Sequence, residues 1–248
     1  MLPAVWGPMV WRCFHKMAFL FDEMPRSAAL EDARNTFQLF LLLMAWLLPC
    51  SDCRASYTAF LDEMAPAMTD AFRKQGVGRL IFELHNLVNS KLGVPQFKMY
   101  DIARRRAAVW PMEAFVEEFF SVLFIIVLNY DANKELDKRT RYRDFLNILP
   151  ALMVHLGDGR AAHAMAFLAD LDSWASQGAL LGKVYNAYVA YRRGRAAPPE
   201  PLASLVARLD LCRASDAAAN AATATTATTA TTASGSGGPN KPGCACGK

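Results

Sequence analysis

A Cys-x-x-Cys motif, Pro49-Cys50-Ser51-Asp52-Cys53, follows directly after an apolar run that ends at Leu48. Two cysteines at this spacing can close a small redox-active disulfide or supply half of a metal site. The motif begins a segment with helical periodicity, and residues three apart on a helix share one face, close enough to form or break a disulfide. A helix N-terminus also stabilises a thiolate. We therefore predict a redox-active pair at Cys50 and Cys53.

A zinc site is one alternative interpretation of the same pair. Structural zinc needs four ligands in tetrahedral geometry. The sequence has no second C-x-x-C and no H-x-x-x-H at finger-like spacing, although Cys244 and Cys246 near the C-terminus could complete such a site. Two inert buried cysteines are the simplest structural interpretation. We favour the redox pair and predict no bound metal.

The composition narrows the class of protein. Hydrophobic residues make up 53% of the chain and charged residues 20%, which is typical of a soluble globular protein. The formal charge of +4 is mild, and the basic groups lack interleaved aromatic residues, so we predict no nucleic-acid partner. The longest apolar runs fall short of the roughly 20 residues that a spanning helix needs. We therefore predict no membrane span, and no secretory signal is evident at the N-terminus.

Four helices are predicted in the first half of the chain. Trp11, Phe14, His15 and Ala18 recur at three- and four-residue spacing, which places them on one helix face. A second helix is predicted from about Leu30 to Leu47, and a third from Cys50 to about Glu63. A fourth follows Gly78 and ends at Gly93 and Pro95, the usual arrangement at a helix C-terminus. The fold class is all-α.

The fourth predicted helix carries an unusual polar group. His85 and Asn89 lie one turn apart, with Asn86 beside them and Lys91 near the end. Asparagine is a poor residue for a helix interior, so two of them in an otherwise apolar helix imply specific hydrogen-bond partners. A heterocyclic cofactor with phosphates would supply such partners, whereas a simple core helix would not need them.

The second half of the chain is predicted to be helical, with no recognisable catalytic set. Helices are expected over 115–129, 142–156, 161–175 and 178–192, separated by Asn, Asp and Gly signals. From Ala214 onward the composition collapses to Ala, Thr, Ser and Gly, which is typical of a flexible linker. This tail ends in Cys244-Ala245-Cys246 and is either without function or a tethered, mobile dithiol with a raised effective concentration at a site elsewhere.

Taken together, these motifs resemble the Erv/ALR family of FAD-linked sulfhydryl oxidases, and in particular its longer members from large DNA viruses. The matching residues are Trp6-Gly7-Pro8-x-x-Trp11-x-x-x-His15-x-x-Ala18, then Pro49-Cys50-x-x-Cys53, then His85-Asn86-x-Val88-Asn89-x-x-Leu92-Gly93. They occur in the family's order over roughly residues 6–100. The family's Trp five residues before the His is Leu80 here, and a His that some members carry after the second Cys is Ser56.

The resemblance implies a domain plan and a cofactor. Residues 1–105 would form a four-helix FAD-binding oxidase domain, 106–212 a helical companion domain, and 213–248 a disordered tail. FAD would be held by Gly7, Trp11, His15, His85, Asn86, Val88, Asn89 and Lys91. Cys53 would lie against the isoalloxazine ring, and Cys50 would exchange with outside thiols. Cys244 and Cys246 resemble the shuttle pair of some members, whereas Cys13 and Cys212 are interpreted as non-catalytic.

The function implied is an FAD-dependent sulfhydryl oxidase that forms disulfides in protein thiols and passes electrons through FAD to molecular oxygen, giving hydrogen peroxide. Its partners would be protein dithiols or a thioredoxin-like relay protein. The resemblance also implies a homodimer, and the sequence suggests a cytoplasmic location, in the host cell or virion if the protein is viral. The alternative is a helical assembly scaffold that retains the oxidase fold.

Overall fold

The computed structural model describes residues 3–130, 136–168, 176–195, 198–207 and 209. In these ranges all regular structure is helical, which confirms the predicted fold class. None of the described helices is long and apolar enough to cross a membrane. The helices are α1 (Pro3–Asp22), α2 (Ala28–Leu47), α3 (Ser51–Lys74), α4 (Val77–Leu92), α5 (Tyr100–Val109), α6 (Met112–Leu128), α7 (Leu136–His155), α8 (Gly159–Met165) with the 3-10 turn η1 (Ala166–Leu168), and α9 (Gln177–Arg192).

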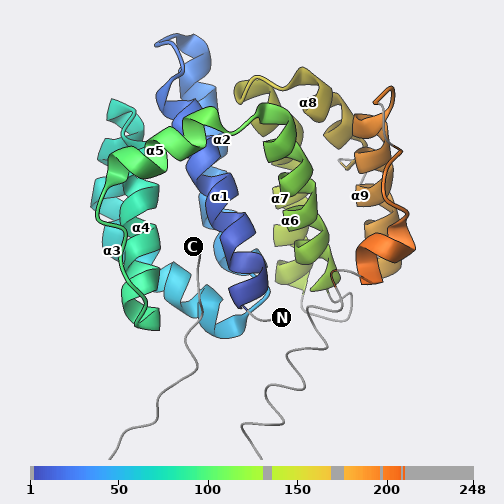
Figure 1. The fold of residues 1–248 in the computed structure, drawn as a ribbon, viewed down its shortest axis with the longest axis horizontal. Helices are drawn as coiled ribbons and strands as arrows, with labels where there is room; N and C mark the ends of the chain where they lie inside the picture. Colours follow the sequence, from blue (N-terminus) through green and yellow to red (C-terminus); the bar gives the residue numbers. More distant parts are fainter. Residues whose placement is uncertain (1–2, 131–135, 169–175, 196–197, 208, 210–248) are drawn as a thin grey trace, which may run out of the picture.

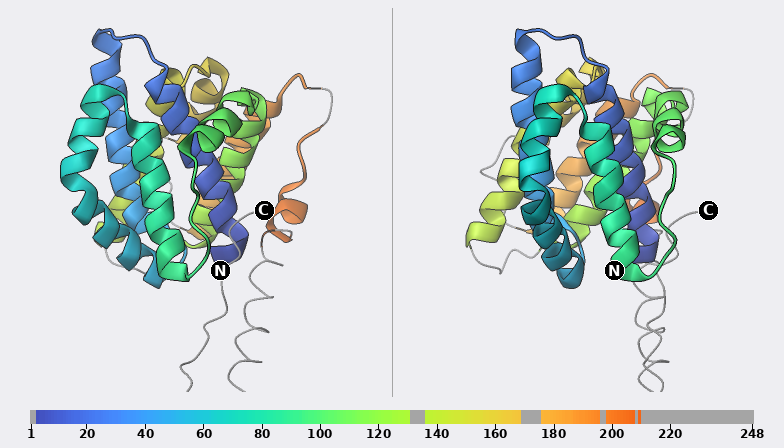
Figure 2. Two further views of the ribbon diagram at one scale, coloured as in Figure 1. Left: turned by 60° about the vertical axis from the view of Figure 1, so that its left-hand side comes forward. Right: turned by 90° about the vertical axis from the view of Figure 1, so that its left-hand side faces the viewer.

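Helix α1 occupies the middle of the molecule. It packs against α4 and α5 on one side and against α6 on the other, and α5 runs across it (Figure 1). In both views of Figure 2 the first turns of α1 and α3 and the last turn of α4 lie at the same end of the molecule. This arrangement brings the start of α3, which carries the cysteine motif, next to α1 and α4.

Several boundaries differ from the sequence predictions, and α7 begins at Leu136, six residues before the predicted start at 142. Helix α3 continues to Lys74, so the predicted end near Glu63 is wrong. Pro66 lies inside α3 on its exposed side, and Met68 and Phe72 continue the buried face beyond it, so tertiary packing outweighs the lost hydrogen bond. Helix α5 was not predicted. The predicted helix over 161–175 ends earlier in its described part, at Met165 and η1, and residues 169–175 lie outside the described ranges.

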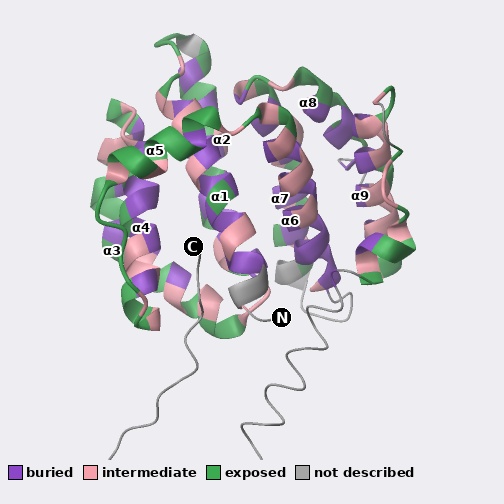
Figure 3. Cartoon of the chain, in the orientation of Figure 1, coloured by how far each residue is buried: buried purple, intermediate pink, exposed green. Residues whose placement is uncertain are grey.

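The helices share one hydrophobic core, and the buried faces of α1, α4 and α6 turn inward (Figure 3). Phe40 of α2 is central to it, because its ring lies 5.8 Å from that of Phe14, 6.1 Å from Phe119 and 5.6 Å from Phe145. Helices α2 and α7 pack together, as do α1 and α6. The predicted domain boundary between residues 105 and 106 falls inside α5, and the division into domains stays a prediction.

Asp22, at the end of α1, joins α1 to α4. Its carboxylate accepts hydrogen bonds from the backbone N–H of Val77 at 2.9 Å and of Gly78 at 2.8 Å, which caps the α4 N-terminus. Burial raises the pKa of Asp22 to about 6, against the lowering effect of these hydrogen bonds. A Cβ atom on Gly78 would lie 2.6 Å from the Tyr100 hydroxyl and 2.9 Å from Oδ2 of Asp22, so a larger residue would have to displace these side chains.

Helix α5 is tied to α1 by a buried lysine. The Nζ of Lys16 donates to the carbonyl oxygens of Ala107, at 2.8 Å, and Ala108, at 3.4 Å. These carbonyls belong to the last turn of α5, where a cation is favoured by the helix dipole. Burial lowers the pKa of Lys16, whose exposed fraction is 4%. The contact fixes α5 over the face of α1 that carries His15.

Candidate functional site

The two motif cysteines form a disulfide at the N-terminus of α3. Their Cα atoms lie 5.1 Å apart. Cys50 is the N-cap residue, and its Sγ accepts a hydrogen bond from the backbone N–H of Cys53 at 3.2 Å. Both cysteines are half-buried. After reduction, the same N–H and the helix dipole would stabilise a thiolate at Cys50.

A small cavity lies behind the disulfide, between the first turns of α1 and α3 and the last turns of α4. Its volume is about 80 Å³, and Cys53 lines it whereas Cys50 does not. Lys91 also lines it and donates a hydrogen bond to the Ser56 hydroxyl. The other residues around it are mostly apolar or aromatic: Pro3, Trp6, Gly7, Val10, Trp11, Phe14, Leu48, Tyr57, Val88 and Leu92. Of the two disulfide cysteines, Cys53 is therefore the one in contact with this mostly apolar space.

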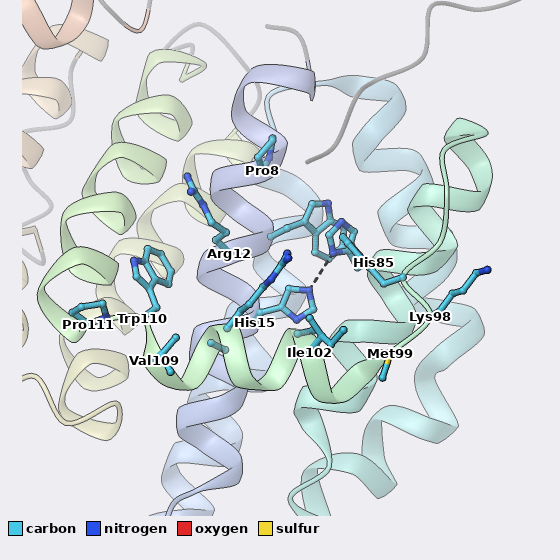
Figure 4. Close-up of a pocket in the computed structure, with 15 residues that line it drawn as sticks. Pro8, Arg12, His15, His85, Lys98, Met99, Ile102, Val109, Trp110 and Pro111 are labelled. Atoms are coloured by element: carbon cyan, nitrogen blue, oxygen red, sulfur yellow. Dashed lines mark hydrogen bonds between the residues drawn. The ribbon is translucent and has the colours of Figure 1, made fainter. Parts of the chain in front are cut away.

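A much larger cavity, of about 910 Å³, lies on the other side of Trp11, between α1 and α5 (Figure 4). Its lining includes three basic residues, Arg12, Lys98 and Arg106, and no acidic residue. The remaining lining is largely apolar and aromatic: Pro8, Trp11, His15, His85, Phe97, Met99, Ile102, Ala103, Ala107, Val109, Trp110 and Pro111. Such a cavity suits a ligand that has both flat apolar rings and negative charge.

Trp11 lines both cavities, and its ring packs against that of His85, which lines the large one. Their rings are stacked with centroids 4.1 Å apart and an interplanar angle of 7°. Nδ1 of His85 lies 3.1 Å from Nε2 of His15, so one of the two nitrogens donates to the other (Figure 4). Burial lowers the pKa of His15 to about 4, and burial together with His15 lowers that of His85 to about 3. Both rings are therefore neutral near pH 7.

Two buried polar atoms of α4 lack a partner among the described residues. They are Nε2 of His85 and Oδ1 of Asn89, in side chains that are 5% and 1% exposed. Leaving a buried donor or acceptor unpaired costs about 1–3 kcal/mol, so such atoms are usually satisfied by something. Both lie on the buried face of α4, where His85 lines the large cavity and Asn89 lines neither cavity.

The structure brings most of the predicted cofactor residues to these cavities. Gly7, Val88 and Lys91 line the small cavity, His15 and His85 line the large one, and Trp11 lines both. Asn86 lines neither cavity. Its side chain accepts a hydrogen bond from the backbone N–H of Phe97 at 2.7 Å and donates one to the Phe97 carbonyl at 3.0 Å, and these bonds hold the segment between α4 and α5. Cys212, Cys244 and Cys246 lie outside the described residues.

Helix α5 and the turn after it contribute cavity residues that were not predicted from the sequence. Ile102 and Arg106, one helical turn apart, and Trp110 one turn further line the large cavity. Their four-residue spacing was the signal that could have found them. Cys13 is buried in α1, and burial raises the pKa of its thiol well above the usual value. Among the described residues, no cluster of three or more His, Cys, Asp or Glu side chains could hold a metal ion.

These features define a helical bundle that places a cysteine pair beside a ligand cavity. Residues 8–108 match the model of the Erv1/Alr family, so the resemblance seen in the sequence is confirmed for that part of the chain. The chain is 26% identical over 91 residues to the mitochondrial FAD-linked sulfhydryl oxidase ERV1 of Saccharomyces cerevisiae, a match that covers 37% of this chain and 44% of the yeast protein.

A viral protein is similar over a longer stretch. The chain is 25% identical over 112 residues to the "Putative FAD-linked sulfhydryl oxidase 096R" of Invertebrate iridescent virus 3, which covers 45% of this chain and 72% of the viral protein. By contrast, the match to the yeast relative spans less than half of that protein's length. No solved structure matches the chain.

Proposed function

We propose that this protein is an FAD-linked sulfhydryl oxidase that forms disulfides in protein thiols. The observation that carries the proposal is the position of Cys53, which is paired with Cys50 and lines the small cavity beside Trp11 and Val88. The names of the yeast and viral relatives, both FAD-linked sulfhydryl oxidases, support the same activity.

The residues present fit a flavin dinucleotide. The unpartnered Nε2 of His85 and Oδ1 of Asn89 would be satisfied by its polar ring edges or hydroxyl groups. The large cavity combines aromatic walls with basic side chains, which matches a nucleotide that carries phosphates. Gly7, Trp11, His15, His85, Val88, Asn89 and Lys91 would hold the cofactor, and Asn86 would fix the segment that carries Phe97 and Lys98. When bound, FAD accepts two electrons from a dithiol and passes them to oxygen, giving hydrogen peroxide.

The cysteine chemistry follows from thiol–disulfide exchange. A substrate thiolate attacks Sγ of Cys50, the Cys50–Cys53 bond breaks, and Cys53 leaves as a thiolate facing the small cavity. The second substrate thiolate then attacks the substrate sulfur of the mixed disulfide, which forms the substrate disulfide and releases Cys50 as a thiolate. Two electrons have then moved from the substrate to the cysteine pair.

The test of the proposal is the absorption spectrum of the purified full chain. We expect a yellow protein whose flavin absorption bleaches when a dithiol is added without oxygen and returns when oxygen is admitted. A protein that stays colourless and inactive after FAD is supplied would contradict the proposal and favour the helical scaffold instead.

We further propose that Cys244 and Cys246 relay electrons from protein thiols to Cys50. The support is the composition of the tail, which tethers a dithiol to the chain through a long run of small residues. Deleting residues 214–248 should leave oxidation of dithiothreitol within about twofold, yet slow oxidation of a reduced protein substrate by about tenfold or more. Oxygen consumption with the two substrates measures this, and equal rates for both would exclude the relay.

The partners proposed are protein dithiols or a thioredoxin-like relay protein, with molecular oxygen as the final acceptor. A homodimer and a cytoplasmic location stay predictions from the sequence. The name of the yeast relative places that protein in mitochondria.

A further inference from the structure

We infer that Arg12 binds the diphosphate of the cofactor and is held in place by Glu118 and Trp110, which lie beyond the family match. This inference rests on the proposed function, because it concerns the same cavity. It assigns part of the helical region after residue 108 a role in cofactor binding.

Two contacts hold the guanidinium of Arg12. Its Nε lies 2.8 Å and its Nη2 2.6 Å from the same oxygen, Oε1 of Glu118 on α6. Its guanidinium carbon lies 6.0 Å from the centroid of the Trp110 ring. These contacts leave both N–H groups of Nη1 and one of Nη2 available for a ligand. An arginine fixed before binding loses less conformational entropy when it meets a phosphate.

Arg12 is also accessible from the large cavity. Its side chain is 61% exposed, whereas that of Glu118 is 17% exposed, so the carboxylate faces inward and the guanidinium outward. Figure 4 shows Arg12 projecting from α1 between Pro8 and Trp110. The two other basic residues of the lining, Lys98 and Arg106, are exposed and form no hydrogen bond or ion pair within the described ranges. Arg12 is thus the preorganised cation of this cavity.

The walls around Arg12 come from both sides of the family boundary. Pro8 and Trp11 lie within residues 8–108, whereas Trp110 and Pro111 follow it and also line the cavity. Glu118 does not line the cavity, so it acts on the ligand only through Arg12. It is therefore a positioning residue.

The experiment measures binding of three ligands to the full chain: FAD, ADP, which keeps the diphosphate, and riboflavin, which lacks it. We expect Arg12→Met to raise the Kd for FAD and ADP by about tenfold or more and to leave the Kd for riboflavin unchanged, since charge-assisted hydrogen bonds to phosphate are lost. Arg73→Met is the matched control, because Arg73 also pairs with an acid, Asp70 at 2.6 Å, but lies outside both cavities.

Glu118 is tested by a pair of variants. Glu118→Leu removes the acceptor and should raise the Kd for FAD and ADP by about threefold to tenfold, whereas Glu118→Gln keeps an acceptor oxygen and should restore binding to within about twofold of wild type. A merely structural effect would weaken riboflavin binding equally. If wild type binds FAD but Arg12→Met binds FAD and ADP as tightly, the inference is wrong and the proposed function stands. If wild type binds neither FAD nor riboflavin, both fall.

Discussion

Replacing Cys53 by serine is expected to lower the rate of dithiol oxidation by about a thousandfold or more. Serine cannot close a disulfide with Cys50, so the exchange that removes two electrons from the substrate has no product on the enzyme. Cys53 is also the one of the two cysteines that lines the small cavity. Oxygen consumption with dithiothreitol at saturating FAD measures the loss.

The control for this variant is Cys13→Ala. Cys13 is 1% exposed, and its raised pKa keeps it as a thiol, so its removal should change the rate by less than about twofold. A flavin-loaded Cys53→Ser protein that oxidises dithiothreitol at the wild-type rate would contradict the assignment of the redox pair. Cys50→Ser should be equally inactive, since it removes the sulfur that the substrate attacks.

Phe40→Ala should cost about 3–5 kcal/mol of unfolding free energy, the usual loss for a large aromatic residue in a packed core. Phe40 is 1% exposed and touches aromatic rings on α1, α6 and α7. Its removal therefore loosens the packing between the family-like part and the helices that follow. We expect urea unfolding to show one transition, shifted to lower urea in the variant.

Leu39→Ala provides the comparison, because Leu39 is the neighbouring residue on α2 and is 41% exposed. It should cost less than about 1 kcal/mol. Circular dichroism follows all the helices at once, and bound flavin reports on the cavities. Two separate transitions, of which only one moves in Phe40→Ala, would show that residues 1–105 and 106–212 unfold as independent domains.

The helices that the sequence predicted well are those with a strong apolar stripe. The stripe through Trp11, Phe14 and Ala18 is buried in α1, and the stop signal at Gly93 marks the end of α4 with a left-handed backbone (φ 67°). Helix α5 was missed because its sequence is polar and rich in arginine. The contacts that hold α5 in place are long-range in sequence. Lys16 donates to carbonyl oxygens of its last turn, and the Tyr100 hydroxyl lies in the space next to Gly78. Local sequence patterns cannot predict contacts between residues that are far apart in the chain.

In the candidate site, too, local spacing predicted some features and long-range contacts determined the others. Motif spacing predicted Cys50, Cys53, His85 and Asn89 as site residues. Cys53 and His85 each line a cavity, Cys50 is bonded to Cys53, and Asn89 lines neither cavity but has an unpartnered buried oxygen. Spacing could not reveal that Trp11 stacks on His85, because the two residues are on different helices. Nor could it show that Asn86 turns to the backbone of Phe97.

The reactivity of the buried Lys16 amine can be used to measure local separation of α5 from α1. Amine-reactive reagents need an accessible, deprotonated Nζ, and Lys16 is 4% exposed with two carbonyl partners. Its acylation in the native protein must therefore wait for a local opening of α5, and the labelling rate measures how often that opening occurs. Lys98, which is exposed and forms no ion pair among the described residues, serves as the internal standard. Mass spectrometry of one time course then yields the opening equilibrium of the helix that covers the large cavity.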